Sequence, residues 1–340
     1  MTKMKIDSTD IVILKELLRD ARKSFTEIAK EINITSTAIR NRYLNMKKAG
    51  LITGSTILIN PKALGLNCYG FLGVKAHQKK INEVKAYLIQ QPGILCTWDK
   101  IQTINIGNYF SLPSLQDFAE LTENMRKNPY IKEIQPLIYL GSPFNQHPDK
   151  LIIKPEIKEN VSKEKASPHS QEIIAEPIEK KHIQTSQLLE LNKTDREIIK
   201  ILSKNARASF NGIAKKLNTS TVQIINRYEK LKEQKIFLNS SITVDPQKMG
   251  YTANAMVYIN LEIGTNTNKI YNNICNMPNV ITIVRVMGEC DLLAIIPLRE
   301  FRELFVLEKQ IRAMKEIKKV QINLNPPFSE WPFNFFAQIF

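Results

Sequence analysis

The chain has 340 residues, of which 43% are hydrophobic and 24% charged, and its formal net charge at pH 7 is +15. The composition is ordinary for a globular protein, and the length is too great for one core, so we expect several domains. No apolar run reaches the roughly 20 residues that a membrane helix needs, and Asp7 and Asp10 stand where a signal peptide would be apolar. We therefore expect a cytoplasmic protein without membrane contact.

One segment of the chain occurs twice, 185 residues apart. A gap-free alignment of residues 9–65 with residues 194–250 gives 22 identities in 57 positions. A period of this length indicates the duplication of a whole domain rather than a solenoid repeat. The repeated pairs include Thr9-Asp10 with Thr194-Asp195, Ala21-Arg22 with Ala206-Arg207, Ser24-Phe25 with Ser209-Phe210, and Asn41-Arg42-Tyr43 with Asn226-Arg227-Tyr228.

Most of the excess positive charge lies in these repeated segments. Residues 1–66 carry 12 basic and 6 acidic side chains, and residues 193–251 carry 12 and 5, so together they hold 13 of the 15 excess charges. A basic surplus on small helical units is typical of proteins with a polyanionic partner.

The first copy has the pattern of three short helices and a strand. Ser8 or Thr9 is predicted to cap the first helix, and the second helix carries an apolar stripe that begins at Phe25 and continues at i+3, i+4 and i+7. A β-rich stretch, 57–59 in the first copy and 242–244 in the second, follows the third helix. This layout predicts winged helix-turn-helix domains at 1–66 and 193–251.

A segment of alternating β and α character follows each copy, at 67–148 and at 252–325. The second is clearer: residues 253–261 alternate with the period of a half-buried strand, and two helical and three further strand patterns follow in β-α-β-β-α-β order. We therefore predict an α+β chain with two winged helix-turn-helix domains, each followed by a ferredoxin-like sandwich domain.

Two further segments depart from globular patterns. Residues 149–192 contain no glycine and no aromatic residue, with seven basic and eight acidic side chains, which predicts a flexible charged linker. The C-terminal tail, 326–340, crowds six aromatic residues into its last 13 positions. Such a tail either forms a contact surface or folds back over its own sheet.

The third helix of each copy has the residue types that DNA recognition needs. Exposed donors and acceptors near the helix start read base edges, and flanking basic groups hold phosphates. Ile225 replaces Arg40 in the second copy, so we expect different half-sites, because arginine suits guanine whereas glutamine and asparagine suit adenine. The predicted contacts to double-stranded DNA are Thr35, Ser36, Thr37, Arg40, Asn41, Arg42 and Lys47 in the first copy, and Ser220, Thr221, Gln223, Asn226, Arg227 and Lys230 in the second.

The pattern D-x(2)-I-L-x(2)-L-x(3)-A-R-x-S-x(2)-E-I-A, from Asp10 to Ala29, resembles the Lrp/AsnC family of transcriptional regulators. The β-α-β-β-α-β segments resemble the family's ligand-sensing and oligomerisation domain. The resemblance implies a DNA-binding transcriptional regulator that responds to an amino acid or similar effector and self-associates through its sandwich domains. In a duplicated chain, we expect domain 67–148 to pair with domain 252–325.

The segment from Met287 to Asp291 resembles a T-G-x-x-D turn of that family. The resemblance implies effector binding by Gly288, Glu289 and Asp291. A simple hairpin turn, which needs glycine and aspartate for backbone reasons alone, is the alternative. In the first copy Gln102 and Asn105 stand at the corresponding positions, so we expect a degenerate sensing domain there.

The cysteines bear on metal and cofactor binding, and the remaining expectations concern alternative functions. The four cysteines, Cys68, Cys96, Cys275 and Cys290, are widely spaced without a CxxC motif, so we expect free thiols, no metal and no cofactor. An architectural DNA-binding protein without an effector is one alternative function.

A second alternative function is that of an enzyme. Some proteins similar to this family are siroheme decarboxylases, and residues 253–257 and 331–335 resemble segments of those enzymes. A tetrapyrrole with many carboxylates would need histidines and arginines gathered in the sandwich domains. His77 and His147 are the only histidines in those domains, so we expect no enzyme.

Overall fold

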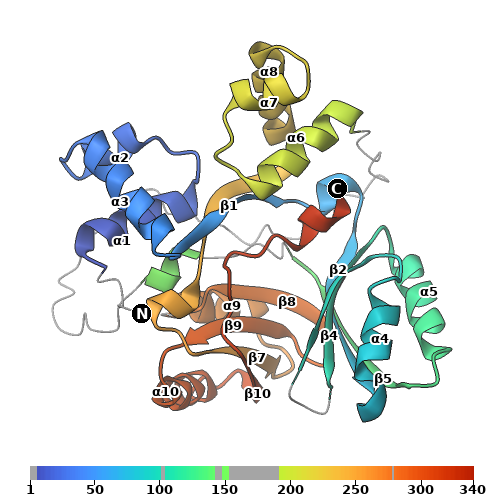
Figure 1. Ribbon diagram of the computed structural model, residues 1–340. Helices are drawn as coiled ribbons and strands as arrows, with labels where there is room; N and C mark the ends of the chain where they lie inside the picture. The colour runs from blue at the N-terminus through green and yellow to red at the C-terminus, as the bar shows by residue number, and fades with distance from the viewer. Residues whose placement is uncertain (1–5, 101–103, 142–147, 153–190, 278) are drawn as a thin grey trace.

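The computed structural model describes residues 6–100, 104–141, 148–152, 191–277 and 279–340, and one order of elements occurs in both halves (Figure 1). This order confirms the predicted fold class. Within the described residues, no helix is both long and apolar enough to cross a membrane. The first half comprises α1 (Ser8–Arg19), α2 (Phe25–Glu31), α3 (Ser36–Lys48), β1 (Ile52–Ile59), β2 (Cys68–Ala76), α4 (Ile81–Leu88), β3 (Ile94–Asp99), β4 (Ile106–Leu112), α5 (Leu115–Arg126) and β5 (Ile131–Tyr139). The second half comprises α6 (Lys193–Lys204), α7 (Phe210–Lys216), α8 (Thr221–Glu233), β6 (Phe237–Val244), β7 (Ala253–Leu261), α9 (Thr267–Cys275), β8 (Thr282–Gly288), β9 (Leu292–Leu298), α10 (Phe301–Arg312) and β10 (Ile317–Asn325).

Side-chain caps fix where the helices of the helix-turn-helix units begin. Asp7 caps α1, so the prediction of Ser8 or Thr9 is wrong. The Asp7 carboxylate accepts the Asp10 N–H at 2.9 Å, and the Asp10 carboxylate accepts the Asp7 N–H at 3.3 Å. This reciprocal box satisfies two amides that no helical carbonyl can reach. Thr35 caps α3 by accepting a backbone N–H at 3.2 Å.

The strands that follow α3 and α8 pair with each other. β1 and β6 form an antiparallel ribbon in which Thr56 faces Ser241. These two residues are equivalent in the repeat, because they lie 185 positions apart, so a pseudo-twofold axis passes through the ribbon at this pair. Each strand thus joins its counterpart in the other half.

The two sandwich domains share one eight-stranded sheet, in the order β10-β7-β9-β8-β5-β2-β4-β3. β5 and β8 join the halves antiparallel through three residue pairs, from Leu137 with Gly288 to Tyr139 with Val286. The expected pairing of the two domains is therefore present within the chain.

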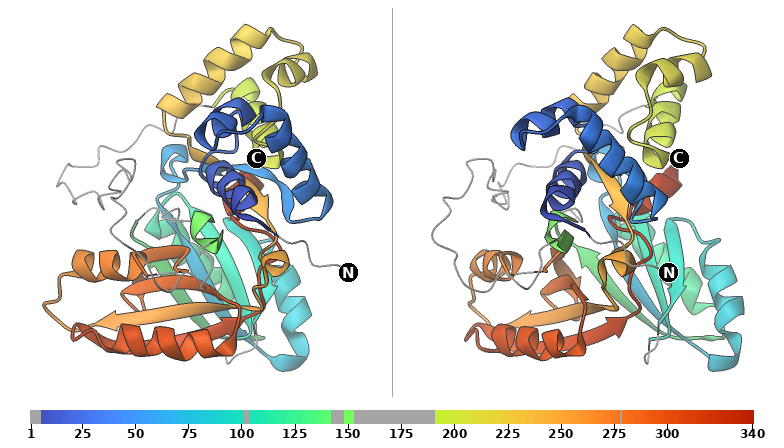
Figure 2. Two further views of the ribbon diagram at one scale, coloured as in Figure 1. Left: turned by 90° about the vertical axis from the view of Figure 1, so that its left-hand side faces the viewer. Right: turned by 60° about the vertical axis from the view of Figure 1, so that its left-hand side comes forward.

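Helices cover one face of this sheet, and the helix-turn-helix units lie beyond the other (Figure 2). Leu72 and Val74 of β2 join α4 and α5 in one core, and the equivalent Val257 and Ile259 join α9 and α10 in another. Residues that alternate with these, such as Phe71, face the opposite way into a third core, which includes α1, α6 and the ribbon. The space between sheet and ribbon is thus enclosed by both halves.

The tail after β10 folds back between the ribbon and the sheet, where Figure 1 shows it in red. Trp331 is 2% exposed and exchanges two backbone hydrogen bonds of 2.8 Å with Val244 of β6. The Phe335 ring centroid lies 3.9 Å from that of Tyr109 in β4. The second of the two predicted alternatives for the tail is therefore the one observed, and the tail covers strands of both halves.

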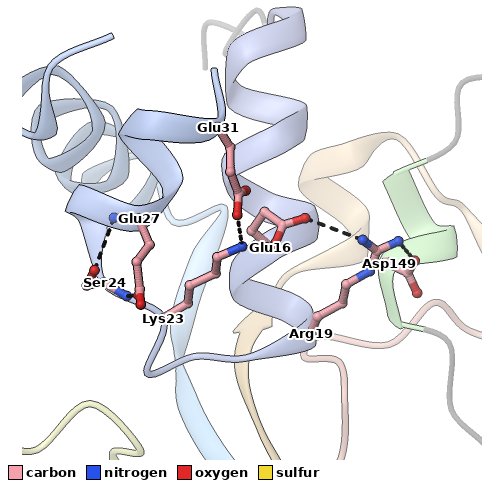
Figure 3. A network of polar contacts seen from close by, with 7 residues as sticks. All are labelled: Glu16, Arg19, Lys23, Ser24, Glu27, Glu31 and Asp149. Carbon is pink, nitrogen blue, oxygen red and sulfur yellow. Dashed lines mark hydrogen bonds and ion pairs between the residues drawn. The ribbon is translucent and has the colours of Figure 1, made fainter. Parts of the chain in front are cut away.

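The beginning of the predicted linker is structured. Residues 149–152 belong to a 3-10 helix, η3 (Pro148–Ile152), which packs against α1 because Leu151 is fully buried and its carbonyl accepts the Tyr251 hydroxyl at 2.7 Å. Residues 153–190, the rest of the predicted linker up to Leu191, lie outside the described residues. Figure 3 shows the polar network that joins η3 to α1 and its neighbours, formed by Glu16, Arg19, Lys23, Glu31 and Asp149.

Candidate nucleic-acid interface and internal cavity

The outer face of α3 carries the polar side chains that the sequence predicts to contact DNA. Ile39, Tyr43 and Met46 are buried beneath it and fix which face points outward. Across the described part of the chain, the side chains of Arg40 and Lys47 make no hydrogen bond or ion pair, so both are free to meet a ligand. The exposed members of the predicted set are Thr35, Ser36, Thr37, Arg40, Asn41 and Lys47.

The outer face of α8 is less basic. Ser220 caps this helix by accepting the Gln223 N–H at 3.2 Å, and Ile225, at the position of Arg40, is 38% exposed. The two recognition helices therefore differ at an exposed position where only the first has a guanidinium. The exposed members of the predicted set are Ser220, Gln223, Asn226 and Lys230, and Thr221 is half-buried.

Two predicted DNA contacts, Arg42 and Arg227, make ion pairs within their own domains. Arg42 donates to Asp7 at 2.6 Å and to Asp10 at 2.9 Å, and Arg227 donates to Asp195, the equivalent of Asp10, at 3.0 Å. The Asp7 and Asp10 carboxylates raise the pKa of Arg42, while the backbone N–H of Asp10 and the Arg42 guanidinium lower the pKa of Asp7. Both arginines thus tie the recognition helix to the first helix of the domain, and their contact with DNA stays a prediction.

The repeated arginines Arg22 and Arg207 join the two helix-turn-helix domains. Arg22 donates hydrogen bonds of 2.6 and 3.1 Å to two backbone carbonyls of the second domain, and its guanidinium lies 4.2 Å from the Phe210 ring centroid. Arg207 donates to carbonyls of the first domain and lies 4.5 Å from the Phe25 centroid. The sequence analysis noted that this arginine is repeated but assigned it no function. Its retention in both copies was the signal that could have indicated one.

The predicted effector turn takes part in strand contacts. Gly288 pairs with β5 at a φ of 150°, where a Cβ would lie 2.4 Å from the Pro136 carbonyl oxygen. The Asp291 carboxylate accepts the Leu261 N–H at 2.7 Å, and an asparagine amide of β7 donates to the Glu289 carbonyl at 2.8 Å. Each residue therefore has a structural role, and effector binding by this turn stays a prediction.

Asn105 makes the corresponding contact in the first sandwich domain. Its side-chain oxygen accepts the Ala76 N–H at 2.8 Å, and its amide donates to the Ala76 carbonyl at 2.9 Å. Ala76 and Leu261 are 185 positions apart, so the asparagine retains the strand contact that Asp291 makes in the second domain. Gln102, at the position of Gly288, lies outside the described residues.

A cavity of about 1040 Å³ lies between the ribbon, α6, the sheet and the tail. Sequence reasoning missed it because its walls come from segments far apart in the chain. Its charged lining residues, Asp99, Lys200, Lys204 and Glu330, are all exposed, and the described lining contains no arginine or histidine. The aromatic lining residues are Tyr69, Trp98, Tyr109, Phe110, Tyr139, Phe328, Trp331, Phe333, Phe335, Phe336 and Phe340.

The described residues offer no metal-binding group of three or more histidine, cysteine, aspartate or glutamate side chains. All four cysteines lie within the described residues and form no disulfide. Cys68 and Cys290 are buried, and Cys96 and Cys275 are half-buried. Burial raises the pKa of the Cys68 and Cys96 thiols to about 11, so both stay protonated at neutral pH.

Comparison with known proteins finds the AsnC-type helix-turn-helix domain twice, at residues 6–47 and 191–232. An uncharacterised HTH-type transcriptional regulator of Pyrococcus horikoshii is 33% identical over 96 residues, which are 28% of this chain and 65% of that protein. The regulator LrpA of the same organism is 46% identical over 79 residues, which are 23% of this chain and 56% of that protein. The matches span less than two thirds of these relatives, and they confirm the predicted relation to the Lrp/AsnC family.

The whole chain has a structural counterpart in the siroheme decarboxylase NirDL. One structure of NirDL matches with a TM-score of 0.60 and 15% identity over 98% of both chains. Another, in complex with an iron-uroporphyrin III analogue, matches with a TM-score of 0.59 over 95% of this chain and 92% of the other. At this identity the likeness establishes the fold alone.

Proposed function

We propose that this chain, an Lrp/AsnC-type protein with two AsnC-type helix-turn-helix domains, is a sequence-specific DNA-binding transcriptional regulator. The observation that carries the proposal is that α3 and α8 keep exposed donors and acceptors on two domains joined by the β1–β6 ribbon. Arg22 and Arg207 add reciprocal contacts between the same domains. DNA would therefore meet both recognition helices at one spacing, and the basic surplus of both domains favours contact with phosphates.

An effector and self-association belong to the same proposal. The family resemblance favours an amino acid at residues 288–291, and further copies of the chain would associate through the sandwich domains. Light scattering at micromolar concentration tests the association, because a strictly monomeric particle would contradict it.

Arg40 provides the test of DNA reading. Binding-site selection with the full chain first defines a site, and Arg40→Ala should then weaken binding there by roughly 1–3 kcal/mol and relax one base position. Because the side chain is exposed and has no hydrogen-bond or ion-pair partner among the described residues, stability should change by less than about 0.5 kcal/mol. An equal loss on all sequences would make Arg40 a phosphate contact.

Arg42→Ala serves as the matched variant. It leaves the Asp10 carboxylate, whose side chain is 6% exposed, without its cationic partner, so it should lower stability as well as any DNA affinity. If the unmodified chain binds unrelated sequences equally well at fixed salt, the protein is an architectural DNA-binding protein and the regulator proposal fails.

A siroheme-decarboxylase-like enzyme is the second candidate, and the full-length likeness to NirDL favours it. The cavity is large enough for a sizeable ligand, and its described lining offers Lys200 and Lys204, but no arginine or histidine, to neutralise a tetrapyrrole's carboxylates. An absorption spectrum recorded after mixing with siroheme separates the candidates. A shifted spectrum together with loss of carboxylate groups from the tetrapyrrole would favour the enzyme, and an unchanged spectrum would favour the regulator.

A further inference from the structure

Helix α10 exposes a cluster of large apolar side chains to solvent. Phe301 is 63%, Phe305 58% and Val306 53% exposed, whereas Leu307 and Ile311, on the other side of the helix, are buried in the core beneath it. The Phe301 and Phe305 rings pack edge to face with their centroids 5.3 Å apart, so they form one continuous patch. An exposed apolar patch of this kind usually marks a contact surface.

The exposed charges around this patch are basic. Between Phe301 and Lys309, the charged residues that are exposed are Arg302 and Lys309. Neither makes an ion pair with any of the described residues, whereas Arg312, at the end of the helix, pairs with Glu308 at 2.9 Å. A surface that covers the patch should therefore be apolar at its centre and acidic at its rim.

Helix α5, the counterpart of α10 in the first half, has such a surface. Both helices have twelve residues, and alignment of Leu115 with Phe301 makes their buried positions coincide. Leu115 is 56% exposed, and the outer face beyond it combines a small residue, over which an aromatic ring can pack, with two exposed carboxylates. In this alignment Ala119 corresponds to Phe305, Glu120 to Val306 and Glu123 to Lys309.

The two outer faces do not meet within one chain. α10 packs on β10 and β9 at one end of the sheet, whereas α5 packs on β4 and β5 in the other half. Figure 1 shows the two helices apart, on different halves of the sheet. A contact between these faces therefore requires a second copy of the chain.

We propose that α10 of one copy docks on α5 of a second copy. The phenylalanine rings of α10 then pack over Leu115 and Ala119, and the basic rim of α10 faces the acidic rim of α5. The proposal rests on the self-association included in the proposed function, and it names the surfaces that would meet. It depends on the divergence of the two halves, because two copies of α5 would bring the carboxylates of Glu120 and Glu123 together.

The geometry of the contact determines how the copies associate. Because it joins two different surfaces, each copy keeps one surface free for a further copy, so the assembly is a ring or an open chain. A helix of twelve residues is about 18 Å long. A single pair of such helices buries much less area than an obligate interface, so the association should depend on protein concentration in the micromolar range.

Charge reversal on either helix tests the docking. Arg302→Glu/Lys309→Glu gives α10 an acidic rim, and Glu120→Lys/Glu123→Lys gives α5 a basic rim. Because all four side chains are exposed, both variants should keep the fold. Each variant alone brings like charges together and should raise the dissociation constant about tenfold or more, measured by light scattering of the full chain over a range of concentrations.

A mixture of the two variants should associate again. The acidic α10 of one variant then meets the basic α5 of the other, and the basic α10 of the second meets the acidic α5 of the first. Lys215→Glu/Lys216→Glu, on the exposed side of α7, reverses the same number of charges elsewhere and should associate like the unmodified chain.

Three results would overturn the inference alone. These are unchanged association of either reversed variant, a mixture that stays dissociated, or loss of association in the α10 variant only, which would mean that two copies of α10 meet each other. An unmodified chain that stays monomeric at every concentration would contradict the self-association of the proposed function as well. DNA binding is judged separately by site selection, so neither outcome decides it.

Discussion

Arg22 and Arg207, equivalent residues of the two repeats, each lie over an aromatic ring of the opposite helix-turn-helix domain, at 4.2 Å from the Phe210 centroid and 4.5 Å from the Phe25 centroid. Each also donates hydrogen bonds to backbone carbonyls of the domain that it reaches. Two identical subunits could exchange such contacts only at sufficient concentration. Here both domains belong to one chain, so these contacts form independently of the protein concentration.

Replacement of Arg22 by methionine tests this exchange. Arg22→Met keeps an apolar side chain over Phe210 but removes the charge and the hydrogen bonds, so the free energy of unfolding should fall by about 1–3 kcal/mol. Arg22→Lys should recover only part of the loss, because an ammonium lacks the planar fork of guanidinium. Urea denaturation measures both. Arg302→Met, at an exposed position of α10, is the control, and an equal effect of the two methionine variants would contradict the role of Arg22.

The helices and their buried faces could be predicted because apolar spacing is local information. The stripe that begins at Phe25 is sufficient to place α2 and its inner face. The β1–β6 ribbon could not be predicted in the same way, because a strand pattern does not specify its partner, and here the partner is the equivalent strand 185 residues away. The arrangement of the two helix-turn-helix domains depends on this pairing.

The candidate site shows a second limit of prediction from the sequence. Helical spacing predicts where the Cα of Arg42 lies, but the length of the side chain lets its guanidinium turn back to Asp7 and Asp10. The cavity depends on long-range packing, because its walls come from residues as distant as Thr97 and Asn334. Only the folded chain brings these groups together.

Gly288 should be essential for the junction of the two sandwich domains. In Gly288→Ala the new Cβ would lie 2.4 Å from the Pro136 carbonyl oxygen, and a φ of 150° is unfavourable for alanine, so the variant should lose roughly 2 kcal/mol or more of stability. Hydrogen exchange should become faster at Tyr139, whose strand pairs with β8. Gly141→Ala, where no atom lies within 4 Å of the Cβ position, is the control, and similar effects of both variants would contradict the prediction.

Trp331 should anchor the tail. Trp331→Ala removes a side chain that is 2% exposed in the wall of the cavity, and the loss of packing should lower stability by about 3–5 kcal/mol. Phe301→Ala removes an aromatic ring that is 63% exposed on α10 and should change stability by less than about 0.5 kcal/mol. Thermal unfolding of both variants measures the difference. A small effect at Trp331 would show that the tail contributes little to the fold.

Lys100 should make the free energy of unfolding vary with pH in the alkaline range. The side chain is 7% exposed, and its Nζ lies 4.7 Å from the Phe71 ring centroid. Burial lowers its pKa from 10.5 to about 8, although the Glu289 carboxylate acts in the opposite direction. Between these two values the unfolded chain holds a proton that the folded chain lacks, so stability rises with pH in this window. Below pH 8 the folded chain bears the full free-energy cost of burying the charged Lys100 ammonium, about 3 kcal/mol at most.

Lys100→Met should therefore stabilise the protein at neutral pH, and its advantage should shrink as the pH rises from 8 to 10.5. Urea denaturation of both proteins at about pH 7 and about pH 10 measures this change, and the tyrosines and thiols that they share cancel in the difference. Lys79→Met, at an exposed position of the same domain, should show no such dependence. An advantage of Lys100→Met that stays constant over this range would mean that Lys100 remains charged when the chain is folded, held by Phe71 and Glu289.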